Sequence, residues 1–246
     1  MSLINISRAY DQGVAEYDSS MRSDHWMRRM IWRQCKHAFK AGDHILDLGC
    51  GTGIDSYHLL KQGMKVTALD ASKAMLESHK KKYHGGENIE FQQGDLTQLE
   101  GLPNDHFDGV VSSFAALNTV DDWPQWQRQV NAILKPKAQI VFHMLNAGDI
   151  WQDSERRQQT EREIAINGQP VRHYFHNANQ LYHDILAENF NLKYSCQFSF
   201  LLPYAKRYRL PSWINLALGE LENLIGRLSN FEQTGRFVLM RLQKRD

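Results

Sequence analysis

The stretch HILDLGCGTGIDS, residues 44–56, places an acid and three alternating glycines between an apolar run and a helix-like segment. Glycines after a strand leave backbone amides unshielded, and a helix that follows directs its N-terminus at the same point. This combination is typical of a site for a nucleotide-like ligand. The dinucleotide fingerprint G-x-G-x-x-G is excluded by spacing. Counted from Gly49, its third glycine falls on Ile54, and counted from Gly51 it falls on Ser56.

Acidic residues end two further strand-like runs. Asp70 closes KVTALD, where its carboxylate is placed to accept hydrogen bonds from both hydroxyls of a ribose. A cap on the helix-like segment ASKAML is the alternative role for Asp70. Asp95 follows a third run in QGDLTQL, where a simple turn is the alternative. With Asp47 ahead of the glycines, acids stand at three successive strand ends, which together indicate a nucleoside site.

In this order the motifs resemble those of class I S-adenosylmethionine-dependent methyltransferases, over roughly residues 40–145. The resemblance implies S-adenosylmethionine as cofactor and S-adenosylhomocysteine as product. It also implies that Asp95 faces the adenine amine and that the amide of Leu96 meets a ring nitrogen. The cofactor-binding residues that it implies are Asp47, Gly49, Cys50, Gly51, Gly53, Asp70, Ala71, Asp95, Leu96, Ser113 and Phe114.

The segment AYDQGVAEYD, ahead of the first long helix, is similar to the broad group of this family that methylates small molecules, including quinone-type rings. On this resemblance, Tyr10 and Tyr17 lie on the acceptor side and close over the sulfonium, whose positive charge favours aromatic faces. Packing of the N-terminal helix is their alternative role. Asn118 would face the transferring methyl group.

Methyl transfer from a sulfonium is an in-line displacement, for which a protein mainly supplies alignment and exclusion of water. A general base is needed only for a neutral hydroxyl or a carbon acid. We expect oxygen as the accepting atom and leave nitrogen and carbon open. The candidates for a catalytic side chain are His143, His173 and Asn118. A lone histidine is more often structural.

No metal site is predicted. Asp121 and Asp122 stand in TVDDWPQW without further oxygen ligands, and they read as the start of a helix with Pro124 in its first turn. The cysteines lack metal-binding spacing, and their odd number favours free thiols in a reducing compartment over a disulfide framework. They are Cys35, Cys50 and Cys196.

Strand-like runs alternate with helix-like runs along the chain, which predicts an α/β fold. We expect a Rossmann-like, doubly wound sheet of seven strands, mostly parallel with an antiparallel C-terminal strand, and helices on both faces. The expected strands are HILDLG, KVTALD, IEFQQGD, FDGVVSSF, AQIVFHML, LKYSCQFSFLL and RFVLMRLQ. The family's usual Lys-Pro-Gly-Gly turn is Lys-Pro-Lys-Ala here, at residues 135–138, a departure that weakens the turn.

The 246 residues are long enough for one domain with one sizeable core. We divide this methyltransferase domain into four parts. They are an N-terminal helical cap (1–40), a cofactor-binding core (41–147), a polar insertion that includes a helix (148–172), and C-terminal helices and strands (173–246). Asn177, with a glutamine three residues later, predicts a helix start in the last part.

Residues 210–235 carry an apolar stripe at helical spacing after a proline and a capping serine. Its members are Trp213, Leu216, Ala217, Leu221, Leu224, Ile225 and Leu228. The stripe is expected to pack on the sheet or a second subunit, or to wall the site of an apolar acceptor. A membrane-surface helix is disfavoured, because Glu220, Glu222 and Asn223 would form its polar face.

With 29 Lys and Arg against 28 Asp and Glu, the net charge of +1 creates no broad field for polyanions. We therefore favour a small-molecule methyltransferase. A tRNA nucleotide methyltransferase is the alternative, supported only by a basic helix face of Arg28, Arg29, Arg33 and Lys36. A non-catalytic S-adenosylmethionine-binding module is the third. We expect a soluble cytoplasmic protein without a membrane span, and a dimer is left open.

Overall fold

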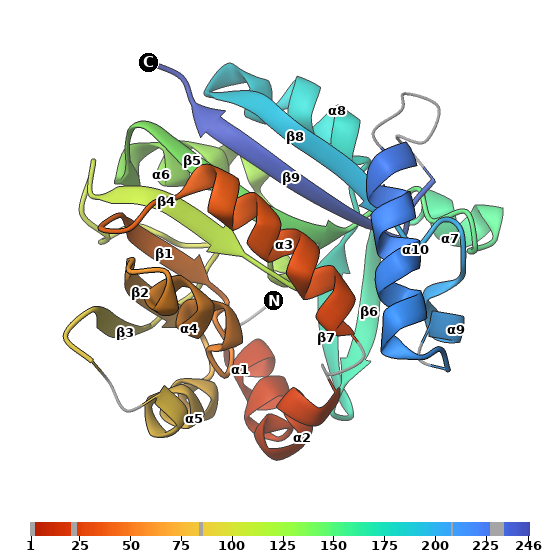
Figure 1. Cartoon of the computed structure of the whole chain (residues 1–246), viewed down its shortest axis with the longest axis horizontal. Helices are drawn as coiled ribbons and strands as arrows, with labels where there is room; N and C mark the ends of the chain where they lie inside the picture. Colours follow the sequence, from red (N-terminus) through yellow and green to blue (C-terminus); the bar gives the residue numbers. More distant parts are fainter. Residues whose placement is uncertain (1–2, 21–23, 84–85, 208, 227–233) are drawn as a thin grey trace.

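The computed structural model describes residues 3–20, 24–83, 86–207, 209–226 and 234–246. A seven-stranded sheet in the order β3-β2-β1-β4-β5-β9-β8 forms its centre (Figure 1). Strands β1 to β5 are parallel, and β9 runs antiparallel to both β5 and β8. The bounds of these strands are β1 His44–Leu48, β2 Lys65–Asp70, β3 Ile89–Gln93, β4 Phe107–Ser112, β5 Leu134–Leu145, β8 Phe190–Phe198 and β9 Phe237–Lys244. The predicted fold class is confirmed.

Helices cover both faces of this sheet, with α3 and α4 on one face and α6 and α8 on the other (Figure 1). The α-helices are α1 Leu3–Asp11, α2 Val14–Ser20, α3 His25–Ala38, α4 Ile54–Lys61, α5 Lys73–Tyr83, α6 Trp123–Ile133, α7 Ser154–Gln158, α8 Ala178–Asp184, α9 Tyr204–Arg207 and α10 Ser212–Ile225. Two 3-10 helices are η2 Ala116–Thr119 and η3 Leu186–Glu188. In the described ranges no helix has the length and apolar character to cross a membrane.

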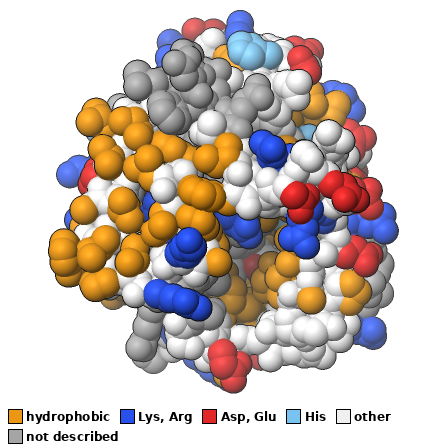
Figure 2. Space-filling model, turned by 90° about the vertical axis from the view of Figure 1, so that its right-hand side faces the viewer, with side chains coloured by type: hydrophobic (Ala, Val, Ile, Leu, Met, Phe, Trp, Pro, Cys, Tyr) orange, Lys and Arg blue, Asp and Glu red, His pale blue; other side chains and the backbone are white. Residues whose placement is uncertain are grey.

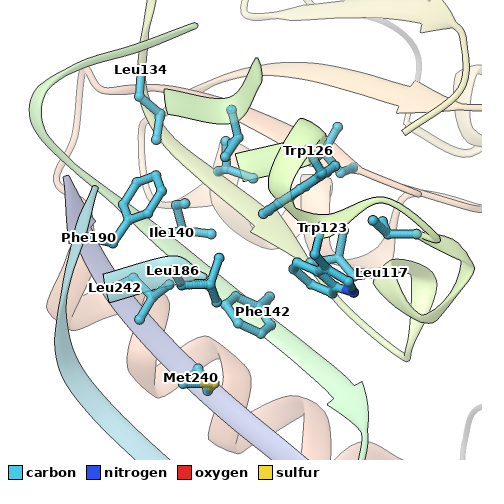
Figure 3. Close-up of a cluster of buried hydrophobic side chains, with 14 of the residues drawn as sticks. Leu117, Trp123, Trp126, Leu134, Ile140, Phe142, Leu186, Phe190, Met240 and Leu242 are labelled. Carbon is cyan, nitrogen blue, oxygen red and sulfur yellow. The ribbon is translucent and has the colours of Figure 1, made fainter. Parts of the chain in front are cut away.

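Side chains alternate along β5 between two hydrophobic cores, one on each face of the sheet. Ile140, Phe142 and Met144 point into one core, whereas Val141 and Leu145 point into the other. Figure 3 shows the first core, where Trp123 and Trp126 of α6 meet Phe142 and residues of β9. Burial on both faces explains why residues 140–145 of β5 are apolar apart from His143.

Two helix starts follow their sequence signals. The Asn177 side chain accepts hydrogen bonds from the amides of Asn179 and Gln180 at the start of α8. The Asp122 carboxylate accepts one from the amide of Gln125 at the start of α6, whose first turn holds Pro124. Both predicted starts are confirmed.

The altered turn at residues 135–138 lies at the start of β5. Lys137 adopts φ +63°, a left-handed conformation that non-glycine residues rarely take. The residue therefore occupies a conformation that a glycine would adopt with less strain.

Residues 148–174 contain more than the helix that the sequence predicts. After α7 comes a two-stranded hairpin of β6 (Glu161–Ile166) and β7 (Gln169–Tyr174). Its two-residue turn, Asn167-Gly168, has positive φ at both positions, which is the preferred geometry of such hairpins. The Asn-Gly pair was the available sequence signal for this hairpin. The tip contacts the N-terminal cap, because the Asn167 amide donates to the carbonyl of Ala9.

Helix α10 buries the opposite side from the one that its apolar stripe predicts. Its buried residues are Asn215, Gly219, Glu222 and Asn223. Trp213 and Leu224 are each 71% exposed, and Leu221 is 46% exposed. Pro211 stands at the N-cap position without a side-chain cap, and Leu228 lies outside the described residues. The expectation that the stripe packs on the same chain holds only in part, because Leu216 packs against the core and Ile225 is half-buried, whereas Trp213, Ala217, Leu221 and Leu224 face outward.

Polar contacts beneath α10 explain this orientation. The buried Glu222 carboxylate is ion-paired with the buried Arg207 guanidinium. It also accepts hydrogen bonds of 3.1 Å from the amides of Phe200 and Leu201. Asn223 accepts one from the Tyr194 hydroxyl. Rotating the helix to bury leucines would leave these charged and polar groups without partners in the interior, which is costly.

We expect Glu222→Gln to lower the free energy of unfolding in urea by about 3–5 kcal/mol, because Arg207 would lose its counter-charge while buried. The matched control is Glu220→Gln on the same helix. Glu220 pairs with Arg33, and both side chains are about 40% exposed. Loss of that pair should cost no more than about 1 kcal/mol. Equal losses in the two variants would contradict the role of Glu222.

Candidate functional site

A cavity that is open at its mouth lies where β1, β2 and β4 end. The order of strands reverses between β1 and β4, so their carboxyl ends leave a crevice there. The lining residues are Ile6, Tyr10, Tyr17, Gly49, Gly51, Leu69, Asp70, Ala71, Met75, Asp95, Leu96, Ser113, Phe114, Ala116 and Thr119.

The glycine turn after β1 forms one wall of the cavity. Gly49 and Gly51 have φ +72° and +53°. A Cβ at Gly49 would lie 2.7 Å from the Ala116 side chain, and one at Gly51 would lie 3.6 Å from the Tyr17 ring. Side chains at these positions would strain the turn and take space from the cavity. Gly53, with φ +84°, starts α4, and a Cβ there would lie 2.1 Å from the His79 ring.

Asp70 joins the turns after β1 and β2. One carboxylate oxygen accepts from the amide of Gly51 and the other from the amide of Ser72, each at 2.8 Å. Burial raises the pKa of Asp70, and these two backbone donors oppose that rise. A carboxylate has about four acceptor positions, so two remain for a ligand.

The capping role considered for Asp70 belongs to Ser72. The Ser72 hydroxyl accepts from the amide of Met75, and its carbonyl accepts from the amide of Leu76. Asp70 is thereby free to serve the cavity that it lines.

Asp95 and Leu96 line the same cavity at the end of β3. Both hydrogen bonds that the Asp95 carboxylate accepts, from the amide and hydroxyl of Thr97, go to the same oxygen, Oδ1. The Leu96 carbonyl accepts from the indole of Trp126, which holds this turn against α6.

Tyr10 of α1 and Tyr17 of α2 face the cavity opposite the strand ends. Burial, together with the nearby Asp70, raises the pKa of Tyr10 to about 12. Burial and the neighbouring Tyr10 raise the pKa of Tyr17 further. Both phenols are therefore protonated near neutral pH, so they act as aromatic surfaces and hydrogen-bond donors and not as bases.

The N-terminal helices are held onto the cofactor turns by polar contacts. The Asp11 carboxylate accepts from the Ser72 hydroxyl, in the turn after β2. Asp18 accepts from the Thr52 hydroxyl, in the turn after β1, and pairs with Lys82 of α5. Each contact joins the cap to one of the two turns that Asp70 connects.

Six of the predicted site residues do not line the cavity: Asp47, Cys50, Gly53, Asn118, His143 and His173. Asp47 is buried under the glycine turn and accepts from the Ser56 hydroxyl. Burial, with Asp55 nearby, raises the pKa of Asp47 to about 7. Cys50 is buried beside it, and burial raises its thiol pKa well above the usual range. These residues support the turn from below.

Asn118 is fully buried and ties η2 to neighbouring backbone. Its amide donates to the carbonyls of Leu145 and Tyr174 and accepts from the amide of Leu145. Its polar atoms are thus engaged at the ends of β5 and β7 rather than directed at a methyl group.

The two candidate histidines are also buried. His143 stacks on Phe237 and lies against Phe114, and burial lowers its pKa to about 3. His173 lies in β7 and not just ahead of a helix, its Nδ1 is 3.0 Å from the carbonyl of Val171, and burial lowers its pKa. In the described ranges, no group of three or more His, Cys, Asp or Glu could hold a metal ion.

Sequence reasoning missed five lining residues: Ile6, Leu69, Met75, Ala116 and Thr119. Met75 had a signal, because it stands in the first turn of the helix that follows Asp70. Ile6 had none, since only the tertiary position of α1 brings it to the cavity. The stripe of α10 is not among the lining residues, so it does not wall this cavity.

The arrangement fits a nucleoside that carries a positive charge. Two carboxylates, a glycine turn without side chains and three aromatic rings surround one space, and both carboxylates and aromatic faces attract a cation.

Residues 45–137 match the family described as methyltransferase domain. The chain is 32% identical over 140 residues to a demethylmenaquinone methyltransferase of Clavibacter sepedonicus, covering 56% of each protein. It is 32% identical over 142 residues to a 2-phytyl-1,4-naphtoquinone methyltransferase of Synechococcus elongatus, covering 54% of this chain and 60% of that protein. The chain thus matches little more than half the length of these relatives.

A solved structure from Mesorhizobium loti, described as an S-adenosylmethionine-dependent methyltransferase, superposes with a TM-score of 0.61. The alignment covers 86% of this chain and 96% of that one at 22% identity. This likeness establishes the fold.

We expect Asp70→Ala to weaken binding of S-adenosylhomocysteine by about tenfold or more, because charge-assisted hydrogen bonds contribute about 1.5–3 kcal/mol each. Calorimetry on the folded variant measures this, with NAD as a ligand that should not bind either protein. Asp122→Ala is the control, since it removes a helix-capping acid outside the cavity. Unchanged affinity in Asp70→Ala would exclude Asp70 from the cofactor site.

Proposed function

We propose that this chain is an S-adenosylmethionine-dependent methyltransferase that transfers a methyl group to a small, largely apolar acceptor of the quinone type; the match of residues 45–137 to the methyltransferase domain family supports this. The single observation that carries this proposal is the cavity at the strand ends. It joins the predicted cofactor residues to an apolar and aromatic wall of Ile6, Tyr10, Tyr17 and Phe114. The two quinone-methylating relatives support the acceptor class.

S-adenosylmethionine is the cofactor, and the residues of the cavity fit it. Asp70 retains acceptor positions for ribose hydroxyls, and Asp95 retains them for the adenine amine. The glycine turn allows the backbone to approach the cofactor closely. When bound, the cofactor supplies an electrophilic methyl group on a positively charged sulfur. The methyl carbon–sulfur bond breaks as the bond to the acceptor forms, and the sulfur keeps the electron pair as a neutral thioether.

This chain's contribution to that step is orientation and exclusion of water. The helices α1 and α2 cover the strand ends, and Asp11 and Asp18 hold them on the cofactor turns. The Tyr10 and Tyr17 rings present aromatic faces to the cavity, where a sulfonium is favoured over bulk solvent.

Oxygen is the accepting atom that we propose. The titratable groups among the described lining residues are two phenols with raised pKa and the carboxylates Asp70 and Asp95, which we assign to the cofactor. No base therefore remains for a carbon acid. A phenol ionises only near about pH 10, so the small ionised fraction of a reduced quinone is the reactive form, its proton goes to solvent, and the rate should rise with pH.

The basic helix face that supported a tRNA methyltransferase in the sequence is partly neutralised in the fold. Arg28 is buried and paired with Asp55, and Arg33 pairs with Glu220, so only Arg29 and Lys36 of the four cations remain exposed and unneutralised on that helix. Two separated cations are a weak footprint for a phosphate backbone.

The test is incubation of the whole chain with methyl-labelled S-adenosylmethionine and a reduced 1,4-naphthoquinone bearing an isoprenoid tail. We expect a labelled methyl ether by mass spectrometry and NMR. A ring-methylated product would overturn the oxygen assignment and keep the acceptor class. Label in tRNA, with none in the quinol, would favour the RNA alternative. Cofactor binding without turnover of either substrate would favour a non-catalytic module.

We expect His143→Leu and His173→Gln to retain kcat/KM within about threefold of the wild type, because neither imidazole reaches the cavity. The pH dependence of kcat/KM should follow ionisation of the acceptor and stay the same in both variants. Phe114→Ala is the contrasting variant, since Phe114 lines the cavity next to His143, and it should lower kcat/KM more than either histidine change. If a folded histidine variant lost one limb of the plot of kcat/KM against pH, that histidine would be identified as a base.

A further inference from the structure

The outer side of α10 is an exposed apolar face, which we define as Trp213, Ala217, Leu221 and Leu224. These positions recur at intervals of three and four residues, so they share one side of the helix. Figure 2 shows hydrophobic side chains gathered on the left of the view, over α10. An exposed apolar area of this kind on one element marks an interaction surface.

The exposure of this face is built into the fold. Glu222, Asn223 and Asn215 on the inner side bond to Arg207, to Tyr194 and to the carbonyl of Arg207, respectively. Gly219 allows the helix to pack on Trp26, because a Cβ there would lie 2.7 Å from the indole. The helix therefore has a specified inner side, and the apolar face is directed outward by polar contacts.

The charges around this face are cationic. The acids of residues 199–226 are Glu220 and Glu222, and both are paired with arginines. Lys206 and Arg209 are exposed in the segment that leads into α10. Arg29 is exposed beside Trp213, since both line a shallow groove between α3 and α10. In Figure 2, Lys and Arg side chains stand beside the hydrophobic area, and the acidic ones gather mainly on the right.

We propose that the apolar face of α10, with Arg29, Lys206 and Arg209, docks on the surface of an anionic lipid membrane. Leucines and a tryptophan enter the interface between headgroups and acyl chains, and the cations meet the lipid phosphates. In the sequence, Glu220 and Glu222 argue against a membrane-surface role. In the fold each is paired with an arginine, so neither opposes it. A symmetric dimer through the same face would bring the cations of both copies to one interface, while both acids of residues 199–226 are already paired with arginines.

The test is flotation of the whole chain with vesicles of phosphatidylcholine alone or with phosphatidylglycerol as about three in ten lipids. We expect affinity for the anionic vesicles to be about tenfold or more higher. The double variant Trp213→Ser, Leu224→Ser should lose about tenfold of it, while Leu192→Ser, an exposed leucine on β8, should lose none. Lys206→Glu with Arg209→Glu should remove the preference for anionic lipid, whereas Lys73→Glu, 75% exposed on α5, should not.

The substituted side chains are exposed, so the unfolding temperature and the affinity for S-adenosylhomocysteine should stay unchanged and report that each variant is folded. Failure of the wild type to float with either vesicle would overturn the proposal. Equal flotation of the Trp213, Leu224 variant and the wild type would also overturn it. A wild-type dimer in sedimentation velocity that this variant dissociates, without vesicle binding, would assign the face to a second copy. None of these measurements uses the methyl acceptor, so they are independent of the proposed function.

Discussion

The Asp70 carboxylate is the interaction on which the site depends, because it joins two turns that are about twenty residues apart in the chain. It accepts from Gly51 in the turn after β1 and from Ser72 in the turn after β2. Ser72 in turn donates to Asp11 of the N-terminal cap. One buried acid thus connects the glycine turn, the start of α5 and the helices that cover the cavity.

The cover of the cavity comes from segments far apart in the sequence. Helices α1 and α2 precede the sheet, whereas the β6–β7 hairpin follows five of its strands, yet the hairpin tip donates to the Ala9 carbonyl. Asn118 fastens the end of β5 to the end of β7 within the same region. The N-terminal helices that line the cavity are therefore held in part by a tertiary contact with the hairpin, while the turns that carry Gly51 and Asp70 follow strands of the sheet.

Helix α10 illustrates how buried charge overrides apolar pattern. Its leucines alone favour an orientation that buries them, at a gain of about 1.5–3 kcal/mol for each fully buried side chain. That orientation would move Glu222 to the surface or separate it from Arg207. In the fold the two are paired in the interior, and Glu222 also accepts hydrogen bonds from backbone amides. The buried ion pair and the bonds of Glu222 to backbone amides are kept only when the polar side faces inward, which is the orientation observed.

The sequence by itself determined the strands, the acids at their ends and the glycine turn, because short apolar runs and left-handed turns are local requirements that residue types satisfy directly. From the sequence alone, Asp70, Asp95 and Gly51 are thus predicted to share one site, and in the fold they line one cavity. Only the tertiary structure decided that Ser72 caps α5, that His143 is a buried core residue, and that α10 turns its leucines outward. The last two depend on partners distant in the chain, which a local pattern does not specify. The Ser72 cap is itself local, but Asp70 is engaged instead by the distant amide of Gly51.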